Sequence, residues 1–299
     1  TYSDKSINKI KNTIDKIALQ KEFVFINAKF NTKIVDKNKI DVSFFLDQLE
    51  KSYVDKINIF GNFITEEKVI RNSLIVDEGD PYNKILFDKS LSNVKSKGIF
   101  KSVTSQILTN DDKNNKIINI TVEEKPTGEV SLGAGFGTSG ASTMFGVKEN
   151  NFLGKGISLD SNLNLSTESI KGQFTVENPN YKNSDKSLFL SLDASETDRL
   201  KTSGYKFNKT GFEIGTRFEY YDDVFLRLGT SNYYEKIETD STASARQKKQ
   251  EGDYIDSFLK VAVTYDKRNQ KFQTSEGFLS SYAIDLPIIS DTYTLINSY

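Results

Sequence analysis

The sequence of 299 residues contains no cysteine, no histidine and no tryptophan. Without cysteine, thiol catalysis and disulfide bonds are excluded. Without histidine, a Ser–His–Asp triad and histidine-centred metal sites are excluded as well. Lys and Arg number 40 and Asp and Glu 41, so the net charge is close to zero and no polyanion-binding surface is indicated. We therefore expect no nucleic-acid partner.

Long hydrophobic runs are also missing. No stretch of about 18 apolar residues occurs, which predicts that the chain has no transmembrane helix. The chain starts at Thr1 without a methionine or the apolar core of a signal peptide, and it ends at Tyr299 inside a strand-like run. We expect a fragment of a longer protein, and its length predicts more than one domain.

Alternating apolar and polar residues dominate the sequence from Val130 to Asp285. In Gly156–Ser166 the apolar side chains fall on odd positions, and in Gly211–Tyr221 they fall on even positions. Side chains on a strand point to opposite faces with period two, so each run has one apolar and one polar face. The strands are expected near 128–138, 141–150, 156–166, 169–178, 186–197, 208–221, 224–237, 254–266, 277–287 and 292–299. Such a series predicts an antiparallel transmembrane β-barrel, and the alternative is a soluble sheet with a buried apolar face.

The first 125 residues follow another pattern. Residues 53–125 predict the order β-α-α-β-β: a strand at 54–60, a helix capped by Thr65, a helix at 83–97 that ends at Gly98, and strands at 102–109 and 116–123. In the second helix the residues expected to point inward are Ile85, Leu86, Ser90, Leu91 and Val94. Residues 3–22, 25–35 and 40–49 repeat the last three elements of that order, which indicates a second copy cut at its start.

The connections between the predicted strands alternate in length. We expect long polar loops at Ser195–Phe207 and Thr239–Asp253 and short turns at Asn151–Lys155 and Tyr221–Asp223. Long loops on one side and short turns on the other are typical of outer-membrane barrels. Tyr220 and Tyr221 beside the short turn are candidates for an interfacial aromatic girdle, although ordinary strand aromatics would look the same.

Short motifs follow one another along the chain at Tyr53–Asn62, Val69–Arg71, Glu78–Asp80, Leu91–Phe100, Gly133–Thr138, Glu177–Tyr181, Asp266–Arg268 and Thr274–Gly277. The most specific are the Asn-Phe-Leu-Gly-Lys-Gly turn after Asn150 and the segment Val122–Gly128. In this order they resemble the BamA family of outer-membrane assembly factors, in which POTRA domains precede a β-barrel and Val122–Gly128 corresponds to the junction between them. The chain departs from the family at Glu50–Ser52, where a glycine-rich turn is usual, and it lacks the family's Val-Arg-Gly-Phe loop because it ends first.

The resemblance implies α+β POTRA repeats followed by a truncated barrel: a partial POTRA domain at 1–51, a complete one at 52–125 and roughly ten barrel strands at 126–299. It implies no enzyme activity and no cofactor. The expected function is insertion of β-barrel proteins into the Gram-negative outer membrane, with the POTRA domains in the periplasm. The expected partners are outer-membrane lipid, unfolded outer-membrane proteins and accessory lipoproteins. A polypeptide secretion pore of the same superfamily and a soluble binding module are the alternatives.

The site residues that we predict lie mainly on the first barrel strand. A strand rich in glycine pairs weakly, so this edge is expected to act as a lateral gate that templates client strands. Alternatively, the small residues only make room inside a crowded barrel. In the family, the acidic residue at the position of Glu78 contacts an accessory lipoprotein, although an ordinary solvated charge would look the same. The partner-binding candidates are Glu78, Gly128, Val130, Leu132, Gly133, Gly135, Phe136 and Gly137.

Two weaker signals predict no further site. Gly133–Gly137 has the glycine content of a phosphate-binding loop, but neither the Lys-Ser/Thr pair nor a helix follows it. The aspartate pairs Asp111–Asp112 and Asp222–Asp223 lack the spacing of a calcium-binding loop and are expected to be solvated turns. We therefore expect no metal site.

Overall fold

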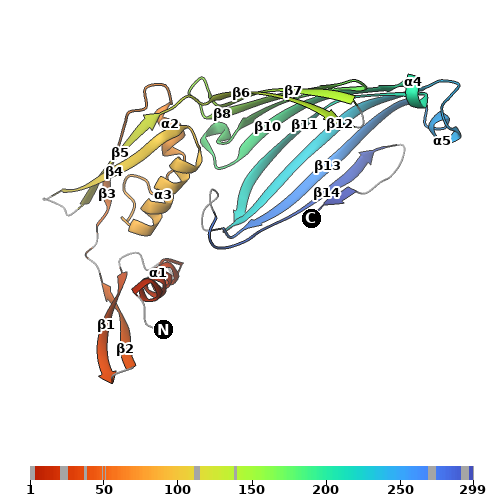
Figure 1. Cartoon of the computed structure of the whole chain (residues 1–299). Helices are drawn as coiled ribbons and strands as arrows, with labels where there is room; N and C mark the ends of the chain where they lie inside the picture. Colours follow the sequence, from red (N-terminus) through yellow and green to blue (C-terminus); the bar gives the residue numbers. More distant parts are fainter. Residues whose placement is uncertain are drawn as a thin grey trace. The chain divides into compact units, whose positions relative to one another are not determined.

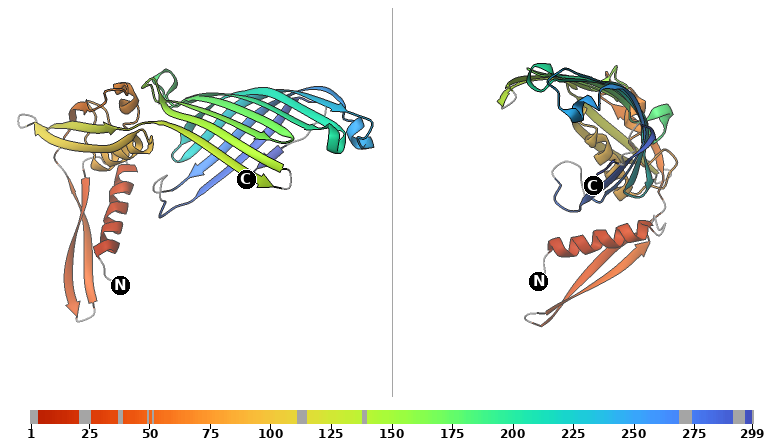
Figure 2. Two further views of the ribbon diagram at one scale, coloured as in Figure 1. Left: turned by 45° about the horizontal axis from the view of Figure 1, so that its top comes forward. Right: turned by 90° about the vertical axis from the view of Figure 1, so that its right-hand side faces the viewer.

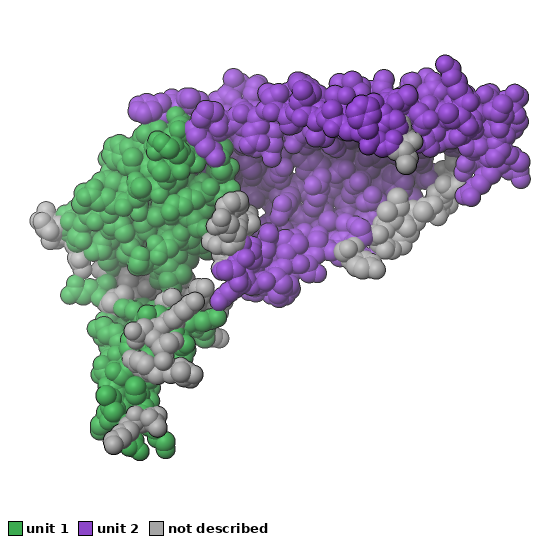
Figure 3. All heavy atoms as spheres, viewed as in Figure 1, with its two compact units in different colours: residues 1–62, 73–124 green, residues 63–72, 125–299 purple. Residues whose placement is uncertain are grey.

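The computed structural model describes residues 4–20, 26–36, 39–48, 50, 52–110, 115–137, 140–268, 274–290 and 296–298. They form two compact units, one of residues 1–62 and 73–124 and one of residues 63–72 and 125–299 (Figure 3). Within these ranges, no helix is both long and apolar enough to cross a membrane. The boundaries that we predicted at residues 51/52 and 125/126 remain a prediction.

The first unit begins with a helix and a two-stranded antiparallel sheet. Helix α1 spans Asp4–Gln20, and strands β1 and β2 span Ile26–Asp36 and Lys39–Gln48, as the sequence predicted. Ile7 and Ala18 of the helix are buried, and the Asp15 carboxylate accepts a hydrogen bond from the backbone N–H of Ala28 in β1 at 2.7 Å. This bond ties the helix to the hairpin; the assignment to a partial POTRA domain remains a prediction.

A three-stranded sheet forms the rest of the first unit. Strand β5 (Asn115–Glu124) lies in the middle, parallel to β3 (Val54–Phe60) and antiparallel to β4 (Phe100–Asn110) (Figure 1). Along the chain the order is β3, α2 (Glu67–Arg71), α3 (Lys84–Ser96), β4, β5, which is the predicted β-α-α-β-β order. Its core includes fully buried isoleucines from two strands, Ile57, Ile118 and Ile120.

Helix α3 buries only part of the stripe that we expected. Its start is capped by Asn83, and Gly98 follows its end in the left-handed conformation, both near the predicted ends. The buried residues are Phe87, Ser90 and Val94, whereas Ile85, Leu86 and Leu91 are only half-buried. The Ser90 hydroxyl accepts the backbone N–H of Ile75 at 2.8 Å and so brings the preceding loop against this face. The predicted inward residues Ser90 and Val94 are therefore confirmed as buried, whereas the expected burial of Ile85, Leu86 and Leu91 was wrong and Phe87 was missed.

The second unit is a curved antiparallel sheet of ten strands in sequential order (Figures 1 and 2). The strands are β6 (Gly128–Gly137), β7 (Gly140–Phe152), β8 (Ile157–Ser166), β9 (Ser169–Asn178), β10 (Ser187–Arg199), β11 (Tyr205–Tyr221), β12 (Val224–Thr239), β13 (Gly252–Asp266), β14 (Leu279–Ile289) and β15 (Ile296–Ser298). They match the ten predicted runs, of which the last lies largely outside the described residues. Strands β6 and β15 are the edges, so the sheet is open.

Apolar and polar side chains separate onto the two faces of this sheet. The register pairs Leu190 with Ile214, and Thr216 with Leu228, on one face. The residues that we expected on the lipid-facing side all share this apolar face: Leu159, Leu163, Leu165, Phe174, Val176, Phe212, Ile214, Phe218, Leu226 and Leu228. Glu213, Arg217 and Arg227 lie on the opposite, polar face. The period-two pattern therefore predicted correctly which of these residues share a face, and the contact of that face with lipid remains a prediction.

One of the two long loops was predicted wrongly. Strand β10 continues to Arg199 and β11 starts at Tyr205, so only the short helix α4 (Leu200–Ser203) and Gly204 connect them. The polar residues of this region pair across strands instead of forming a loop, as in the 2.8 Å ion pair between Lys206 and Glu196. The loop after Thr239 is long as expected and contains helix α5 (Ala245–Lys248), which Ser244 caps.

Candidate functional site

Strand β6 is an edge strand with one partner among the described strands. It pairs with β7 from Gly128↔Glu149 to Gly137↔Gly140, and no described strand lies on its other side. Its outward N–H and C=O groups therefore form a row that an added strand can pair with. All the candidate residues on the predicted first barrel strand fall on this one element; Glu78 lies in the other unit.

The apolar side chains of β6 are far more exposed than those of the next strand. Val130, Leu132 and Phe136 are 73%, 77% and 92% exposed, whereas Phe145 and Val147 on β7 are 45% and 41% exposed. All five lie on the apolar face of the sheet, because Val130 faces Val147 and Leu132 faces Phe145. The edge strand therefore presents the least covered part of the apolar face.

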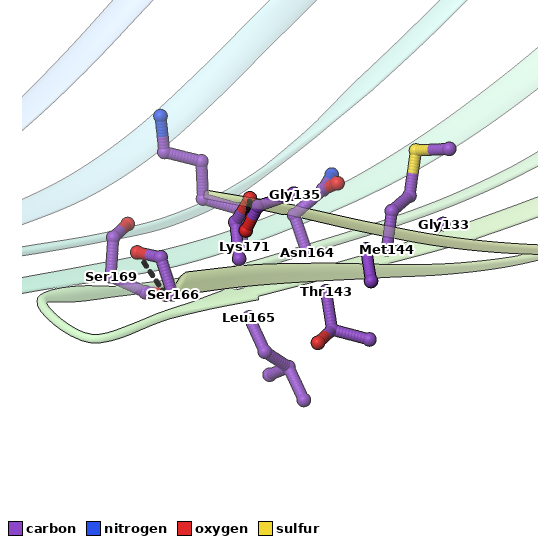
Figure 4. Close-up of a pocket in the computed structure, with 11 residues that line it drawn as sticks. Gly133, Gly135, Thr143, Met144, Asn164, Leu165, Ser166, Ser169 and Lys171 are labelled. Carbon is purple, nitrogen blue, oxygen red and sulfur yellow. Dashed lines mark hydrogen bonds between the residues drawn. The ribbon is translucent and has the colours of Figure 1, made fainter. Parts of the chain in front are cut away.

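The polar face of β6 carries three glycines with open space above them. A Cβ atom at Gly137 would meet nothing within 4 Å, and at Gly133 and Gly135 it would make ordinary contacts of 3.7 Å and 3.5 Å. In Figure 4, which draws the residues that line a pocket in this part of the sheet, Met144 and Lys171 point to one side of the ribbon and Leu165 to the other. In the described structure Gly133, Gly135 and Gly137 thus do not relieve crowding, whereas a Cβ at Gly128 would come within 3.2 Å of the Glu149 carboxylate.

Glycines on the other strands behave differently. At Gly146 a Cβ would approach the Ser131 hydroxyl to 2.5 Å, and at Gly215 it would approach the Leu228 carbonyl and the Phe189 ring to 2.6 Å. Contacts under 3 Å cannot be accommodated without movement, so these glycines are required by close packing. The explanation that small residues make room holds for Gly146 and Gly215 but not for the candidate glycines Gly133, Gly135 and Gly137.

The start of β6 is fixed by polar side chains. The Thr127 hydroxyl donates to the Glu149 carboxylate at 2.5 Å, and the same oxygen accepts the backbone N–H of Asn151 at 2.6 Å. The backbone N–H of Asn150 donates to the Thr127 carbonyl. Strand β6 is therefore anchored at its first residues and sparsely packed over its glycine-containing remainder.

Thr65 does not cap helix α2 as the sequence predicted. The N-cap residue is Glu66, and its side chain makes no capping bond. The buried Thr65 hydroxyl instead accepts a 2.9 Å hydrogen bond from the side-chain amide of Asn151, at the end of β7. Asn151 uses its amide oxygen to accept the backbone N–H of Gly156 at 2.7 Å, which closes the turn between β7 and β8. We call these contacts the Thr65–Asn151 joint; they lie within the second unit.

The turn motif is visible in the sequence, but the hydrogen bond from Asn151 to Thr65 is not. The available signal was the pair of glycines, Gly154 and Gly156, which both have positive φ. A Cβ at Gly154 would meet the Ile64 carbonyl at 2.0 Å, and at Gly156 it would meet the Val69 side chain at 2.8 Å. The glycines therefore permit residues 64–69 to lie directly against the turn. Beside the joint, a hydrogen bond from Lys68 lowers the pKa of Glu66 below its ordinary value.

On the polar face of the middle strands, charged side chains connect neighbours. Glu213 on β11 accepts from Arg227 on β12 at 3.0 Å and pairs with Lys260 on β13 at 3.3 Å. Lys260 also reaches Asp285 on β14 at 3.4 Å, and the Arg227 guanidinium lies 3.9 Å from the centre of the Phe189 ring on β10. Five consecutive strands are thereby linked by side chains in addition to their backbone ladders.

Glu78 takes part in the structure of the first unit. Its carboxylate accepts the backbone N–H of Ile57 in β3 at 3.0 Å. The backbone of Val54 donates to Asp80 and accepts from Gly79, so the loop lies along the outer edge of β3. One carboxylate oxygen of Glu78 therefore helps to hold this loop, and a role in partner binding remains a proposal.

The described structure does not arrange the candidate phosphate-binding and calcium-binding residues as a binding site. Gly133–Gly137 forms part of strand β6, so it is not a phosphate-binding loop. The described part of the chain contains no cluster of metal-binding side chains, and Asp223 forms a 2.6 Å ion pair with Lys267. The pair Asp111–Asp112 lies outside the described residues. Tyr220 and Tyr221 are exposed, and their ring centres lie 4.6 Å apart in an edge-to-face arrangement; their place in an aromatic girdle remains a prediction.

Comparison with family models gives two matches. Residues 52–125 match the POTRA model, described as a surface antigen variable number repeat, and residues 151–293 match the Omp85 superfamily domain. The two ranges include β3 to β5 and most of the large sheet, respectively. They follow one another in the order that the sequence motifs predicted.

The curated relatives are outer membrane protein assembly factors. BamA of Neorickettsia risticii is 25% identical over 272 residues, which cover 89% of this chain and 36% of the relative. BamA of Buchnera aphidicola is 30% identical over 166 residues, which cover 53% of this chain and 26% of the relative. The chain thus spans about a third or less of the length of these relatives.

Two solved structures share the fold. BamA from Haemophilus ducreyi lacking POTRA domains 1–3 has a TM-score of 0.65 at 20% identity, over 96% of this chain and 58% of that one. CdiB from Acinetobacter baumannii has a TM-score of 0.54 at 13% identity, over 99% of this chain and 54% of that one. The chain is an outer-membrane protein with its POTRA domain in the periplasm. The chain thus combines a POTRA domain with an Omp85 superfamily domain, and BamA proteins are among its relatives.

Proposed function

We propose that this chain takes part in the insertion and folding of β-barrel proteins in the outer membrane, with β6 as the lateral gate. The observation that carries the proposal is that β6, in the described structure, has an unpaired edge and loosely packed glycines. Its outer backbone edge has no partner among the described strands, and packing does not require glycine at positions 133, 135 and 137. An unpaired strand edge in lipid is energetically unfavourable, so pairing with a client strand stabilises both chains.

Two further features support a role for the POTRA domain in receiving clients. Strand β4 is an edge of the three-stranded sheet, and Ile107 and Leu108 on it are exposed. The opposite edge, β3, is covered in part by the loop that ends at Pro81. An extended client segment can therefore add to the sheet along β4, through backbone hydrogen bonds that tolerate many sequences.

Crosslinking tests the gate directly, because this chain contains no cysteine. Single cysteines at Leu132 and Phe136 on β6 are expected to form disulfides with cysteines in a client strand during assembly. A cysteine at Asn164, on the polar face of β8, is the control and should not. Equal trapping at all three positions would contradict the gate.

A backbone test complements the crosslinks. Pro at Gly135 removes a ladder N–H, whereas Ala there adds a methyl group that fits. We therefore expect Gly135→Pro to reduce client assembly much more than Gly135→Ala. Equal activity of the two variants would show that the backbone of β6 does not pair with clients.

Accessory lipoproteins are the proposed partners of the Glu78 loop. Glu78→Gln removes the charge and keeps an oxygen that can accept the Ile57 N–H, whereas Glu78→Ala removes both. If the charge binds a partner, both variants should lose copurification of the lipoproteins. If only Glu78→Ala loses it, the carboxylate acts by holding the loop in place.

A polypeptide translocation pore is the second candidate. The similarity to CdiB, at a TM-score of 0.54, shows the same fold and favours neither function by itself. A secretion pore passes its substrate through the lumen, so crosslinks would then form to residues of the polar face such as Asn164 and not to Phe136.

A further inference from the structure

We propose that Phe63 and Ile64 form a membrane-contact element that inserts its side chains into the periplasmic leaflet of the outer membrane, in line with the apolar face of the sheet. Phe63 and Ile64 are 93% and 73% exposed, and Leu153 in the adjoining turn is 69% exposed. Large apolar side chains gathered at the surface mark an interaction site. The inference rests on the placement of the sheet in the membrane and is independent of assembly activity.

The element is held in a fixed place. The backbone N–H of Glu66 donates to the Gly154 carbonyl at 2.8 Å, and the Thr65–Asn151 joint lies beside it. The absence of a Cβ at Gly154 permits direct contact with the Ile64 carbonyl. The two residues that follow Phe63 and Ile64 are therefore hydrogen-bonded to the end of β7 and to the turn after it, and the Ile64 carbonyl lies directly against Gly154.

This attachment places the element at one end of the apolar face. Phe152 pairs with Ile157 across the base of the turn, and Ile157 lies on the same face as Leu159, which is one of the lipid-facing residues. Leu153 occupies the left-handed conformation at φ 56°, which is unfavourable for leucine. The exposed apolar surface thus continues from the strands through Phe152 to the turn that carries Ile64.

The same end of the sheet carries other exposed aromatic residues. In a sequential antiparallel sheet the turns after β7, β9, β11 and β13 lie at one end. Exposed aromatics occur at the last three of them: Tyr181, Tyr220, Tyr221 and Phe278. Aromatic residues collect at membrane–water boundaries, so this row marks the periplasmic boundary of the bilayer. The turn after β7 lacks an aromatic beyond Phe152, and Phe63 supplies one there.

Lipid is the occupant that these observations favour. A protein partner would need a defined interface, whereas the residues here continue a face that contacts acyl chains along its whole length. Apolar side chains at the edge of a membrane protein commonly lie at the boundary between headgroups and acyl chains. A protein partner is kept as an outcome of the test.

Tryptophan fluorescence tests the proposal, because this chain contains no tryptophan. The Phe63→Trp and Ile64→Trp variants of the complete protein are each reconstituted in phosphatidylcholine vesicles. The acyl chains of the lipid are brominated either near the headgroup or near the chain end. Bromine quenches tryptophan on contact. We expect both variants to lose fluorescence, and more with bromine near the headgroup.

Two controls define the outcomes. Ile214→Trp on the apolar face should be quenched, and Phe225→Trp, near the same end of the sheet but on its polar face, should not. If Ile214→Trp is quenched while positions 63 and 64 are not, the membrane-contact element is refuted and the sheet placement stands. If added periplasmic protein, but not bromine, changes their emission, the partner is a protein. If Ile214→Trp is not quenched, the sheet placement itself fails and the proposal with it.

The Thr65–Asn151 joint allows a second, independent experiment. In the Phe63→Trp background, Thr65→Val removes the acceptor for the Asn151 amide while keeping a similar shape. This variant should reduce quenching, because residues 63 and 64 are then less firmly attached to the turn. Asn162→Ala, which removes an amide on the polar face of β8, should leave it unchanged. Unaltered quenching in Thr65→Val would refute the role of the joint in positioning the element.

Discussion

The first strand of the large sheet and the strands in its middle differ in what holds each one in place. Strands β11, β12 and β13 each pair on both sides and are also linked by Glu213, Arg227 and Lys260. Strand β6 pairs on one side, and its polar contacts are concentrated at Thr127 and Glu149 near its start. The same sheet thus contains a strongly connected middle and an edge anchored mainly at one end.

Glycine shows the same difference. At Gly215 in the middle of the sheet, the neighbouring backbone and the Phe189 ring leave no room for a Cβ. At Gly135 and Gly137 on the edge, a Cβ would fit. Glycine therefore serves close packing in one region. In the other it leaves a strand with little side-chain contact, which suits repeated unpairing and pairing.

The largest effect is expected for a charge on the apolar face of a middle strand. Ile214→Arg should lower the free energy of unfolding by ~2–4 kcal/mol if this position lies near the membrane midplane. Asn164→Arg, on the polar face, should change it little. Urea titration of the complete protein in lipid vesicles measures both. A small effect at Ile214 would contradict the assignment of the two faces.

A smaller effect is expected for a single methyl group at glycine. Gly215→Ala should destabilise the sheet by about 1–3 kcal/mol, because overpacking forces its neighbours to move. Gly135→Ala should stay within about 0.5 kcal/mol of the parent protein. The same urea titration distinguishes them. Equal losses at both positions would show that the edge strand is as closely packed as the middle.

The smallest effect is expected for an exposed ion pair in the three-stranded sheet. A hydrogen bond from Lys101 holds the pKa of Glu123 below its ordinary value of 4.5. A depressed carboxyl pKa contributes stability that is present above that ordinary value and is lost as the pH falls through the lower, folded pKa. Residues 52–125 should therefore lose slightly more stability on acidification than the Lys101→Met variant does, as thermal unfolding at a series of pH values would measure. Identical pH profiles would show that the pair contributes nothing.

Local periodicity was enough to predict the strands of the large sheet. Each strand has one apolar and one polar face, and this alternation is visible in the sequence of the strand itself, as in Gly211–Tyr221. The order β-α-α-β-β of the POTRA domain also followed from local signals, such as Asn83 and Gly98 at the ends of α3.

Features that depend on distant partners were missed. Thr65 has the sequence of a helix cap, but the N-cap is Glu66, and the Thr65 hydroxyl accepts a hydrogen bond from Asn151, which lies 86 positions away. In α3 the buried face includes Phe87, beside Ser90, whose hydroxyl accepts the backbone N–H of Ile75 in the preceding loop. The polar residues after Ser195 looked like a loop because their partners, such as Lys206 for Glu196, lie on the next strand.

The most direct test of the gate is a disulfide that locks β6. A cysteine replacing Gly135 and one in the terminal strand of the complete protein, placed within about 6 Å between Cα atoms, would join the two edges. We expect the oxidised protein to remain a folded barrel but to lose the ability to assemble client barrels. Reduction of the disulfide should restore this assembly activity. Assembly at the parental level in the oxidised, locked protein would contradict the gate.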